Sequence, residues 1–223
     1  MPLLGTAILA VWNDVDPNIE DDFNEWYLQE HLAERTSVPG MIRGRRYRAD
    51  KGSPRYMAFY EAASMDVLTK GDYRTQLENP TAWTQRLLPH FRFMRRGLCD
   101  VVMSVGDRLG GAAAVIHLTP ADTPRLNEWI TKTLLPELHA LPGIVAAHLW
   151  TFAPGEPRSP TTVLSQNAEP DHPLAWIIVV ESLQVAAANT ITGVIMARDP
   201  KMHGAAKVSA DPVYRLLYAL DRR

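Results

Sequence analysis

The chain has 223 residues, of which 46% are hydrophobic and 22% charged, and its formal net charge is −2. This composition is typical of a globular protein with a buried core, and it gives no indication of a nucleic-acid or anionic-membrane partner. The single cysteine, Cys99, excludes an intramolecular disulfide and suits a reducing cytoplasm. The apolar start from Leu3 to Trp12 is too short to cross a membrane and lacks the basic flank of a signal peptide. We therefore expect a cytoplasmic protein.

The first hundred residues predict the order strand, helix, strand, strand, helix, strand. Apolar β-branched runs indicate the strands, and apolar positions at helical spacing indicate the helices. Val38-Pro39-Gly40 ends the first helix, because proline disfavours helix at its predecessor and glycine permits a turn. This order is the ferredoxin-like split unit. The expected strands are residues 6–12, 41–48, 55–62 and 95–105, and the expected helices are 23–36 and 67–77.

The second half of the chain repeats the first. Trp26 and Gly40 recur 103 positions later as Trp129 and Gly143, and further pairs recur 120 positions later, including Tyr56 with Trp176 and Asn79 with Asp199. The step of 120 − 103 = 17 indicates a tandem duplication with one insertion in the second copy. We expect a first unit at residues 1–106, a linker at 107–111, and a second unit at 112–223 with an insertion at 153–173. Its expected strands are 113–119, 143–152, 174–182 and 214–220.

One segment resembles a known family. It is the run from Phe23 to Arg35 (FNEWYLQEHLAER), followed by Val38-Pro39-Gly40-Met41 and the basic strand Arg45-Arg46-Tyr47. This pattern resembles the EthD-like members of the dimeric α+β barrel superfamily. The resemblance implies an α+β fold in which two ferredoxin-like βαββαβ units pack sheet against sheet. Such barrels usually form between subunits, but here one chain carries both units, so the barrel is expected within the chain, and a homodimer remains possible.

The resemblance also implies a range of activities rather than one. Relatives include cofactor-free monooxygenases, polyketide cyclases, lactone isomerases and haem-binding enzymes, and the fold by itself does not select among them.

His31 is the first catalytic candidate. Histidine titrates near neutral pH, which suits proton transfer, and the repeat has Leu134 in its place, so the fold does not require histidine there. Tyr27, replaced by Ile130, is expected to hold a substrate oxygen. Glu30 is replaced by threonine in the repeat and is expected to orient His31 or relay its proton. The alternative for His31 is a half-buried histidine that bonds a backbone carbonyl.

The second strand of the first unit is basic. Alternation places Arg43 and Arg45 on one face and Arg46 and Arg48 on the other. A buried arginine needs an anion, so we expect Arg45 to neutralise substrate charge and Arg43 to bind substrate. The alternative is a set of ion pairs with carboxylates of the protein, namely Glu34, Asp50 and Glu61. Glu34 and Glu61 recur in the second unit as Glu137 and Glu181, which favours a structural role for them.

Aromatic residues complete the expected pocket. Trp26 shares the helix face of His31, and Tyr60 is replaced by Val180 in the repeat, so both are predicted to contact substrate. Metal binding is not expected, since no histidine or cysteine cluster has ligand spacing. Nucleotide-binding and serine-hydrolase motifs are also missing. Haem remains a possibility through one histidine of the second unit, with four candidates: His117, His139, His148 and His203.

The sequence thus predicts a cofactor-independent enzyme of lyase, isomerase or cyclase type. Its substrate would be a small, largely apolar molecule, aromatic or oxygenated, and it would act by acid–base catalysis. The alternatives are a non-catalytic protein that binds a small molecule and a haem enzyme. No nucleic-acid or membrane partner is expected.

Overall fold

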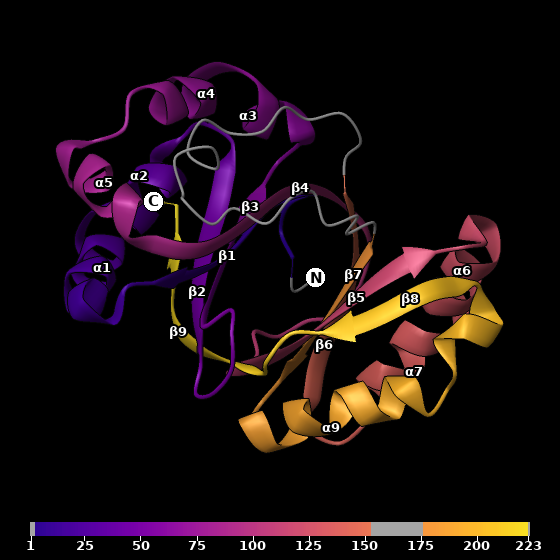
Figure 1. The fold of residues 1–223 in the computed structure, drawn as a ribbon. Coiled ribbons are helices and arrows are strands. Elements are labelled where there is room, and N and C mark those ends of the chain that lie inside the picture. Colours follow the sequence, from indigo (N-terminus) through magenta and orange to yellow (C-terminus); the bar gives the residue numbers. More distant parts are fainter. Residues whose placement is uncertain (1–2, 153–175, 223) are drawn as a thin grey trace.

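The computed structural model describes residues 3–152 and 176–222, and the predicted insertion at 153–173 lies outside them (Figure 1). The first unit has the expected order of elements. These are β1 (Ala7–Val15), α1 (Glu20–Trp26), a π-helical turn (Tyr27–His31), α2 (Leu32–Ser37), β2 (Met41–Ala49), β3 (Tyr56–Ala62), α3 (Met65–Thr69), α4 (Gly71–Glu78), α5 (Ala82–Leu87) and β4 (Phe91–Gly106).

The second unit repeats this order. Its elements are β5 (Ala112–Pro120), α6 (Thr123–Trp129), a π-helical turn (Ile130–Leu134), α7 (Leu135–His139), β6 (Ile144–Phe152), β7 (Trp176–Ser182), α9 (Val185–Met196), β8 (Ala205–Ala210) and β9 (Tyr214–Asp221).

The strands form one closed antiparallel barrel, which confirms the predicted fold. The order is β7-β6-β4-β1-β3-β2-β9-β5, and pairing of β5 with β7 closes the ring of eight. Each unit contributes the sheet of a ferredoxin-like fold, and the helices of the two units lie on opposite sides of the barrel (Figure 1). The two sheets therefore pack face to face within one chain.

The last strand of each unit joins the two units. In β4, residues 91–100 pair with β1 of the same unit, and residues 99–106 pair with β6 of the other. In the second unit two strands form the equivalent pairings. Strand β8 pairs with β5 of the same unit, and β9 pairs with β2 of the first unit. Pro212 lies between β8 and β9, where a residue without a backbone N–H interrupts a strand.

The structure supports the duplication and its register. Trp26 and Trp129 each end a helix immediately before a π-helical turn. Gly40 and Gly143 each have a positive φ, +91° and +78°, which explains why glycine occupies both turns.

Three local predictions need correction. The fourth strand begins at Phe91 rather than at residue 95, and the helix expected at 67–77 is divided into α3 and α4. Strand β8 was not expected, because Lys207 and Ser209 are exposed and its sequence carries little apolar pattern. Pairing with β5 holds it in place.

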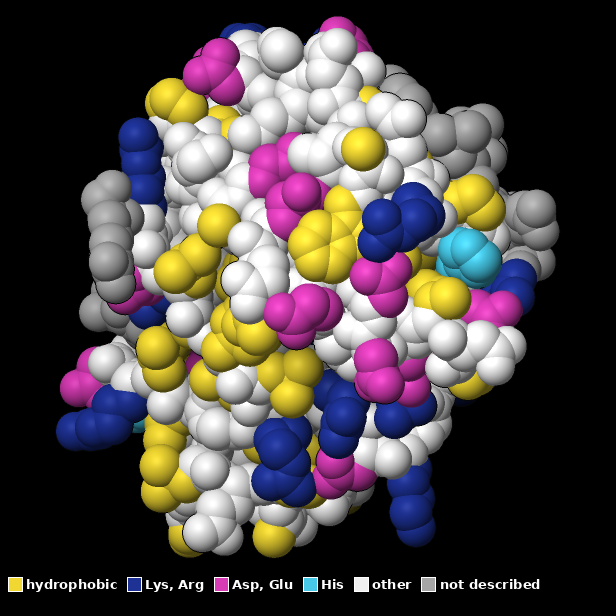
Figure 2. Space-filling model, turned by 90° about the vertical axis from the view of Figure 1, so that its left-hand side faces the viewer, with side chains coloured by type: hydrophobic (Ala, Val, Ile, Leu, Met, Phe, Trp, Pro, Cys, Tyr) yellow, Lys and Arg dark blue, Asp and Glu magenta, His cyan; other side chains and the backbone are white. Residues whose placement is uncertain are grey.

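The apolar core has three parts. One fills the barrel, with Trp12, Phe59 and Trp150 at its centre. The other two lie between the outer face of each sheet and the helices of the same unit. On the face shown in Figure 2, acidic and basic side chains are interspersed with apolar ones. Among the described residues, no helix has the length and apolar character needed to cross a bilayer.

Candidate functional site

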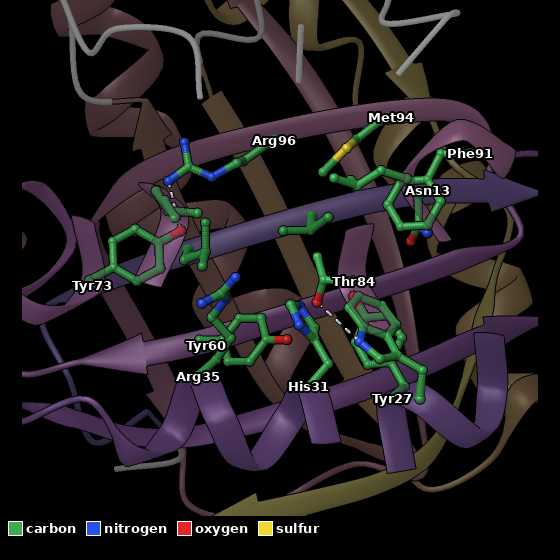
Figure 3. A pocket seen from close by; sticks show the side chains of 15 residues that line it. Asn13, Tyr27, His31, Arg35, Tyr60, Tyr73, Thr84, Phe91, Met94 and Arg96 are labelled. Atoms are coloured by element: carbon green, nitrogen blue, oxygen red, sulfur yellow. Dashed lines mark hydrogen bonds between the residues drawn. The ribbon is translucent and has the colours of Figure 1, made fainter. Parts of the chain in front are cut away.

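A pocket lies in the first unit, between the outer face of the sheet and the covering helices (Figure 3). The cavity has a volume of about 50 Å³, measured as the space open to the centres of water molecules. The walls are mostly aromatic and aliphatic, with a few polar groups. The lining residues are Leu9, Val11, Asn13, Trp26, Tyr27, His31, Arg35, Tyr60, Tyr73, Leu77, Thr84, Leu88, Phe91, Met94 and Arg96.

One face of the helical segment that contains the π-helical turn reaches the pocket. Tyr27, His31 and Arg35 follow one another at intervals of four residues, and all three line the pocket. Glu30 lies at the rim instead, where its carboxylate accepts hydrogen bonds from Thr81 Oγ1 at 2.5 Å and from Trp26 Nε1 at 3.2 Å. It is thus placed to brace Trp26 against the segment that begins α5.

His31 lies in the middle of the lining, between Tyr60 and Tyr27 (Figure 3). Its side chain is 13% exposed, and its Nδ1 lies 3.4 Å from Glu34 Oε2. The ring stacks on Trp26 at 4.0 Å and meets Tyr27 edge-on at 5.0 Å between centroids. Burial lowers the pKa of His31 to about 4, against the opposing effect of Glu34. The imidazole is therefore neutral at physiological pH, and Glu34 favours the tautomer that leaves Nε2 as the proton acceptor.

Glu34 is held as a carboxylate. Burial by itself would raise its pKa, but contact with His31 and the charge of Arg35 outweigh burial and lower the pKa. Its Oε1 lies 3.7 Å from Arg35 Nη1. The counterpart in the second unit, Glu137, pairs with Arg198 at the surface, 2.9 Å away. Both glutamates thus have a cationic partner, but only Glu34 also faces a histidine.

Two tyrosines of the pocket are kept protonated. Burial raises the pKa of Tyr27, and the nearby Arg46 guanidinium and Tyr60 hydroxyl only partly offset this rise. Burial also raises the pKa of Tyr60, to well above its ordinary value. Both hydroxyls therefore remain hydrogen-bond donors at neutral pH. Arg46 lies beneath Tyr27, with its guanidinium carbon 3.7 Å from the ring centroid.

Three buried polar atoms of the lining lack a hydrogen-bond partner of standard geometry. Among the described residues, these are the side-chain oxygen of Asn13, the hydroxyl of Tyr60 and Nδ1 of His31, which has the Glu34 carboxylate near it at 3.4 Å. Most buried polar atoms in proteins are paired, with protein or with water. Unpaired atoms in a pocket therefore indicate a place for a polar ligand.

The structure separates the predicted site residues into two groups. Trp26, Tyr27, His31 and Tyr60 line the pocket, and Glu30 lies at its rim. Arg43 and Arg45 do not join them, because they project from the other face of β2 into the barrel. The expectation that Arg45 shares a site with His31 is therefore corrected. The sequence pattern gave the two faces of this strand but not which face meets the helices.

Inside the barrel Arg45 has protein carboxylates as partners. It is fully buried, with Nη2 2.8 Å from Glu61 Oε1 and Nη1 2.7 Å from Glu181 Oε1. Arg43 Nε lies 2.8 Å from Glu61, and His148 Nε2 lies 3.0 Å from Glu181. The paired glutamates are thus structural partners of strand residues, which agrees with their presence in both units.

Sequence reasoning missed Thr84 of α5 and four further polar residues of the lining: Asn13, Arg35, Tyr73 and Arg96. Strand register and the repeat offsets give their counterparts in the second unit, which are Leu118, Leu138, Gly193 and Ala210. Asn13 interrupts an otherwise apolar strand, which was a usable signal. The other three come from helices and a strand whose facing was not evident from the pattern.

The corresponding region of the second unit is an apolar core. Ile130, Leu134 and Leu138 are buried there against Leu118 and Val180. The same framework therefore carries polar side chains in the first unit and aliphatic ones in the second. Packing alone does not require the polar set, which marks the first unit as the candidate active unit.

Solved structures share this architecture. An anthrone oxidase-like protein matches with a TM-score of 0.65 and 11% identity, over 97% of this chain and 92% of its own. A candidate monooxygenase from Lactobacillus acidophilus matches with a TM-score of 0.61 and 9% identity, over 97% of each chain. A variant chlorite dismutase from Candidatus Nitrospira defluvii matches with a TM-score of 0.56 and 11% identity, over 95% of this chain and 91% of its own.

This chain has the dimeric α+β barrel fold. At such low identities the likeness concerns the fold alone, and the narrower EthD-like assignment stays a prediction. No protein-family model and no curated protein matches the chain.

The pocket of this dimeric α+β barrel does not fit a haem. His31 is its one lining histidine, and Trp26 and Tyr27 pack directly against the imidazole ring, which leaves no room for a porphyrin beside it. In the second unit His117 bonds Asp211 at 2.8 Å and His148 bonds Glu181, both within the barrel. Within residues 3–152 and 176–222, no group of three metal-ligating side chains is placed to hold an ion.

Proposed function

We propose that the first-unit pocket is the active site of a cofactor-independent enzyme that removes a proton from a small, largely apolar molecule. The observation that carries this proposal is His31, held neutral among aromatic side chains with the Glu34 carboxylate 3.4 Å from its Nδ1. A carboxylate behind an imidazole fixes the tautomer and stabilises the imidazolium that forms on proton transfer. The aliphatic counterpart of this arrangement in the second unit argues against a purely structural reason for it.

The proposed step is a single proton transfer. Nε2 of His31 accepts a proton from an activated carbon or a hydroxyl of the substrate, and the bonding electron pair stays on the substrate as an enolate or phenolate. The hydroxyls of Tyr27 and Tyr60 remain protonated and can donate hydrogen bonds to the new oxyanion. The positive charge on His31 then lies between Glu34 and the anion it has created.

The fate of the anion defines the reaction type. Rearrangement gives an isomerase, ring closure a cyclase and loss of a leaving group a lyase, and all three begin with the same step. Two structural neighbours are an anthrone oxidase-like protein and a candidate monooxygenase, and an electron-rich anion is also the species that an oxygenase without a cofactor would react with O₂.

A second candidate function is binding without catalysis. The pKa of His31, about 4, favours this alternative, because a base with such a low pKa gains little from accepting a proton. The two functions differ in one respect. A base accelerates the exchange of a carbon-bound proton with solvent, whereas a binding protein only retains the ligand.

The test is proton exchange in D₂O followed by NMR, with anthrone and tetralone as carbon acids. The wild-type protein should accelerate exchange, and His31→Leu should reduce the enzymatic rate by about 10² to 10⁴, the usual contribution of a positioned base. The matched control is His139→Leu, which removes an exposed histidine of α7 and should leave the rate unchanged. Equal acceleration by the wild type and by folded His31→Leu would refute the proposal.

A further inference from the structure

One end of the pocket is built around two arginines and a tyrosine. Arg35 from α2 and Arg96 from β4 lie on Tyr73 of α4, with guanidinium carbons 5.8 Å and 5.6 Å from its ring centroid. Arg96 Nη2 also donates a 2.8 Å hydrogen bond to the Tyr73 hydroxyl. Figure 3 shows this end of the lining apart from Asn13 and Phe91 at the other end, with His31 between them.

Of the two arginines at this end, Arg35 alone has a carboxylate partner among the described residues. No aspartate or glutamate is among the residues that line the pocket. Arg35 Nη1 lies 3.7 Å from Glu34 Oε1 and donates a 2.8 Å hydrogen bond to Gln76 Oε1. Arg96 forms no ion pair with any described residue, and Tyr73 is its one hydrogen-bond partner among them.

Two other arginines of the sheet, Arg45 and Arg95, face the barrel interior, and each has a carboxylate of the protein as its partner. A third, Arg46, is buried on the helix-facing side, where Asn24 and aromatic rings contact it. Arg96 lies on this same side but is half-buried and lines the pocket, so its guanidinium is accessible to a ligand there. A guanidinium in this position forms its strongest hydrogen bonds with an anion.

We propose that Arg96, supported by Tyr73 and Arg35, is the binding site for a carboxylate of the substrate. This inference rests on the proposed function for the reacting end of the molecule. A guanidinium binds a carboxylate through two parallel hydrogen bonds, and the Tyr73 hydroxyl holds the Arg96 fork in place. The substrate is therefore an aromatic or largely apolar acid. Its carboxylate lies at Arg96, its apolar body crosses the aliphatic wall, and its reacting atom lies at His31.

The second unit supports a functional origin for this end of the pocket. The counterparts of Arg35, Tyr73 and Arg96 are Leu138, Gly193 and Ala210, so the whole arrangement is confined to the unit that carries His31. The framework folds without these charges, as it also does without the histidine.

The test is calorimetric titration with benzoate and with benzamide, its neutral counterpart of nearly equal shape. We expect the wild type to bind benzoate more tightly than benzamide. Arg96→Gln should weaken benzoate binding by about tenfold or more, as for loss of one partner of a charge pair, and should leave benzamide binding unchanged. Arg96→Lys, which keeps the charge but not the fork, should restore part of the affinity.

The matched control is Arg74→Gln, which removes the same charge from the exposed side of α4 beside Tyr73. It should bind benzoate like the wild type. Equal affinity for benzoate and benzamide, undiminished benzoate binding by folded Arg96→Gln, or no binding of either probe would overturn the proposal. The proposal for His31 as a base can fail independently of the proposal for Arg96. In that case His31→Leu would exchange protons like the wild type and would still bind benzoate more tightly than benzamide.

Discussion

The state of His31 gives a prediction that needs no substrate. The side chain is 13% exposed and its pKa in the folded protein is about 4, whereas an unfolded histidine titrates near 6.5. Between these pH values the unfolded chain binds more protons than the folded chain. The free energy of unfolding must therefore rise with pH across this window, and the contribution of a neutral His31 is lost as the pH falls.

The size of this effect follows from the two pKa values. Linkage gives a loss of about 2 kcal/mol from His31 between pH 7 and pH 4.5. In His31→Leu this loss is removed, because leucine does not titrate and the corresponding Leu134 is fully buried in the second unit. We expect the variant to differ from the wild type by less than about 1.5 kcal/mol at pH 7. Between pH 7 and pH 4.5 the wild type should lose about 2 kcal/mol more stability than the variant.

Urea denaturation at both pH values measures this difference. Carboxylates also titrate in the window, but they are common to both proteins and largely cancel in the comparison. His139→Leu serves as the control, since His139 is exposed and its removal should leave the pH dependence unchanged. If the wild type and His31→Leu lose stability in parallel between pH 7 and pH 4.5, then His31 is not held neutral by burial, and the argument for its role as a base weakens with it.

Two further substitutions test the barrel and the pocket. Glu181→Gln leaves Arg45 with one carboxylate in the barrel and should lower the free energy of unfolding by about 3–5 kcal/mol, measured in urea, because a buried charge loses its partner. Glu128→Gln is the control, because Glu128 pairs with Lys132 at the surface, and it should not measurably change the free energy of unfolding. If Glu181→Gln and Glu128→Gln changed stability equally, the buried network would be contradicted. Asn13→Leu copies Leu118 of the second unit and should leave thermal stability unchanged or raise it by up to about 1 kcal/mol while slowing proton exchange. A marked loss of melting temperature would show instead that Asn13 is structural.

The sequence by itself determined the architecture. A repeat with fixed offsets requires that equivalent residues occupy equivalent elements, and Trp26 with Trp129 and Gly40 with Gly143 do so. Alternating and helical patterns then located most strands and helices, because burial of one face imposes a period on the sequence. The comparison of the two units also selected His31, Tyr27 and Tyr60, since a polar residue that one copy replaces with an aliphatic one is not needed for packing.

Only the tertiary structure decided how these residues combine. Strand alternation separated Arg45 from Arg46, but the closure of the barrel decided that Arg45 faces the interior and pairs with Glu61 and Glu181. The packing of the helical segment on the sheet placed Arg35 in the pocket lining and left Glu30 to bond Thr81 and Trp26. Arg96 joined them from β4, more than sixty residues away along the chain. Such long-range placement depends on how sheet and helices pack, and no local pattern records it.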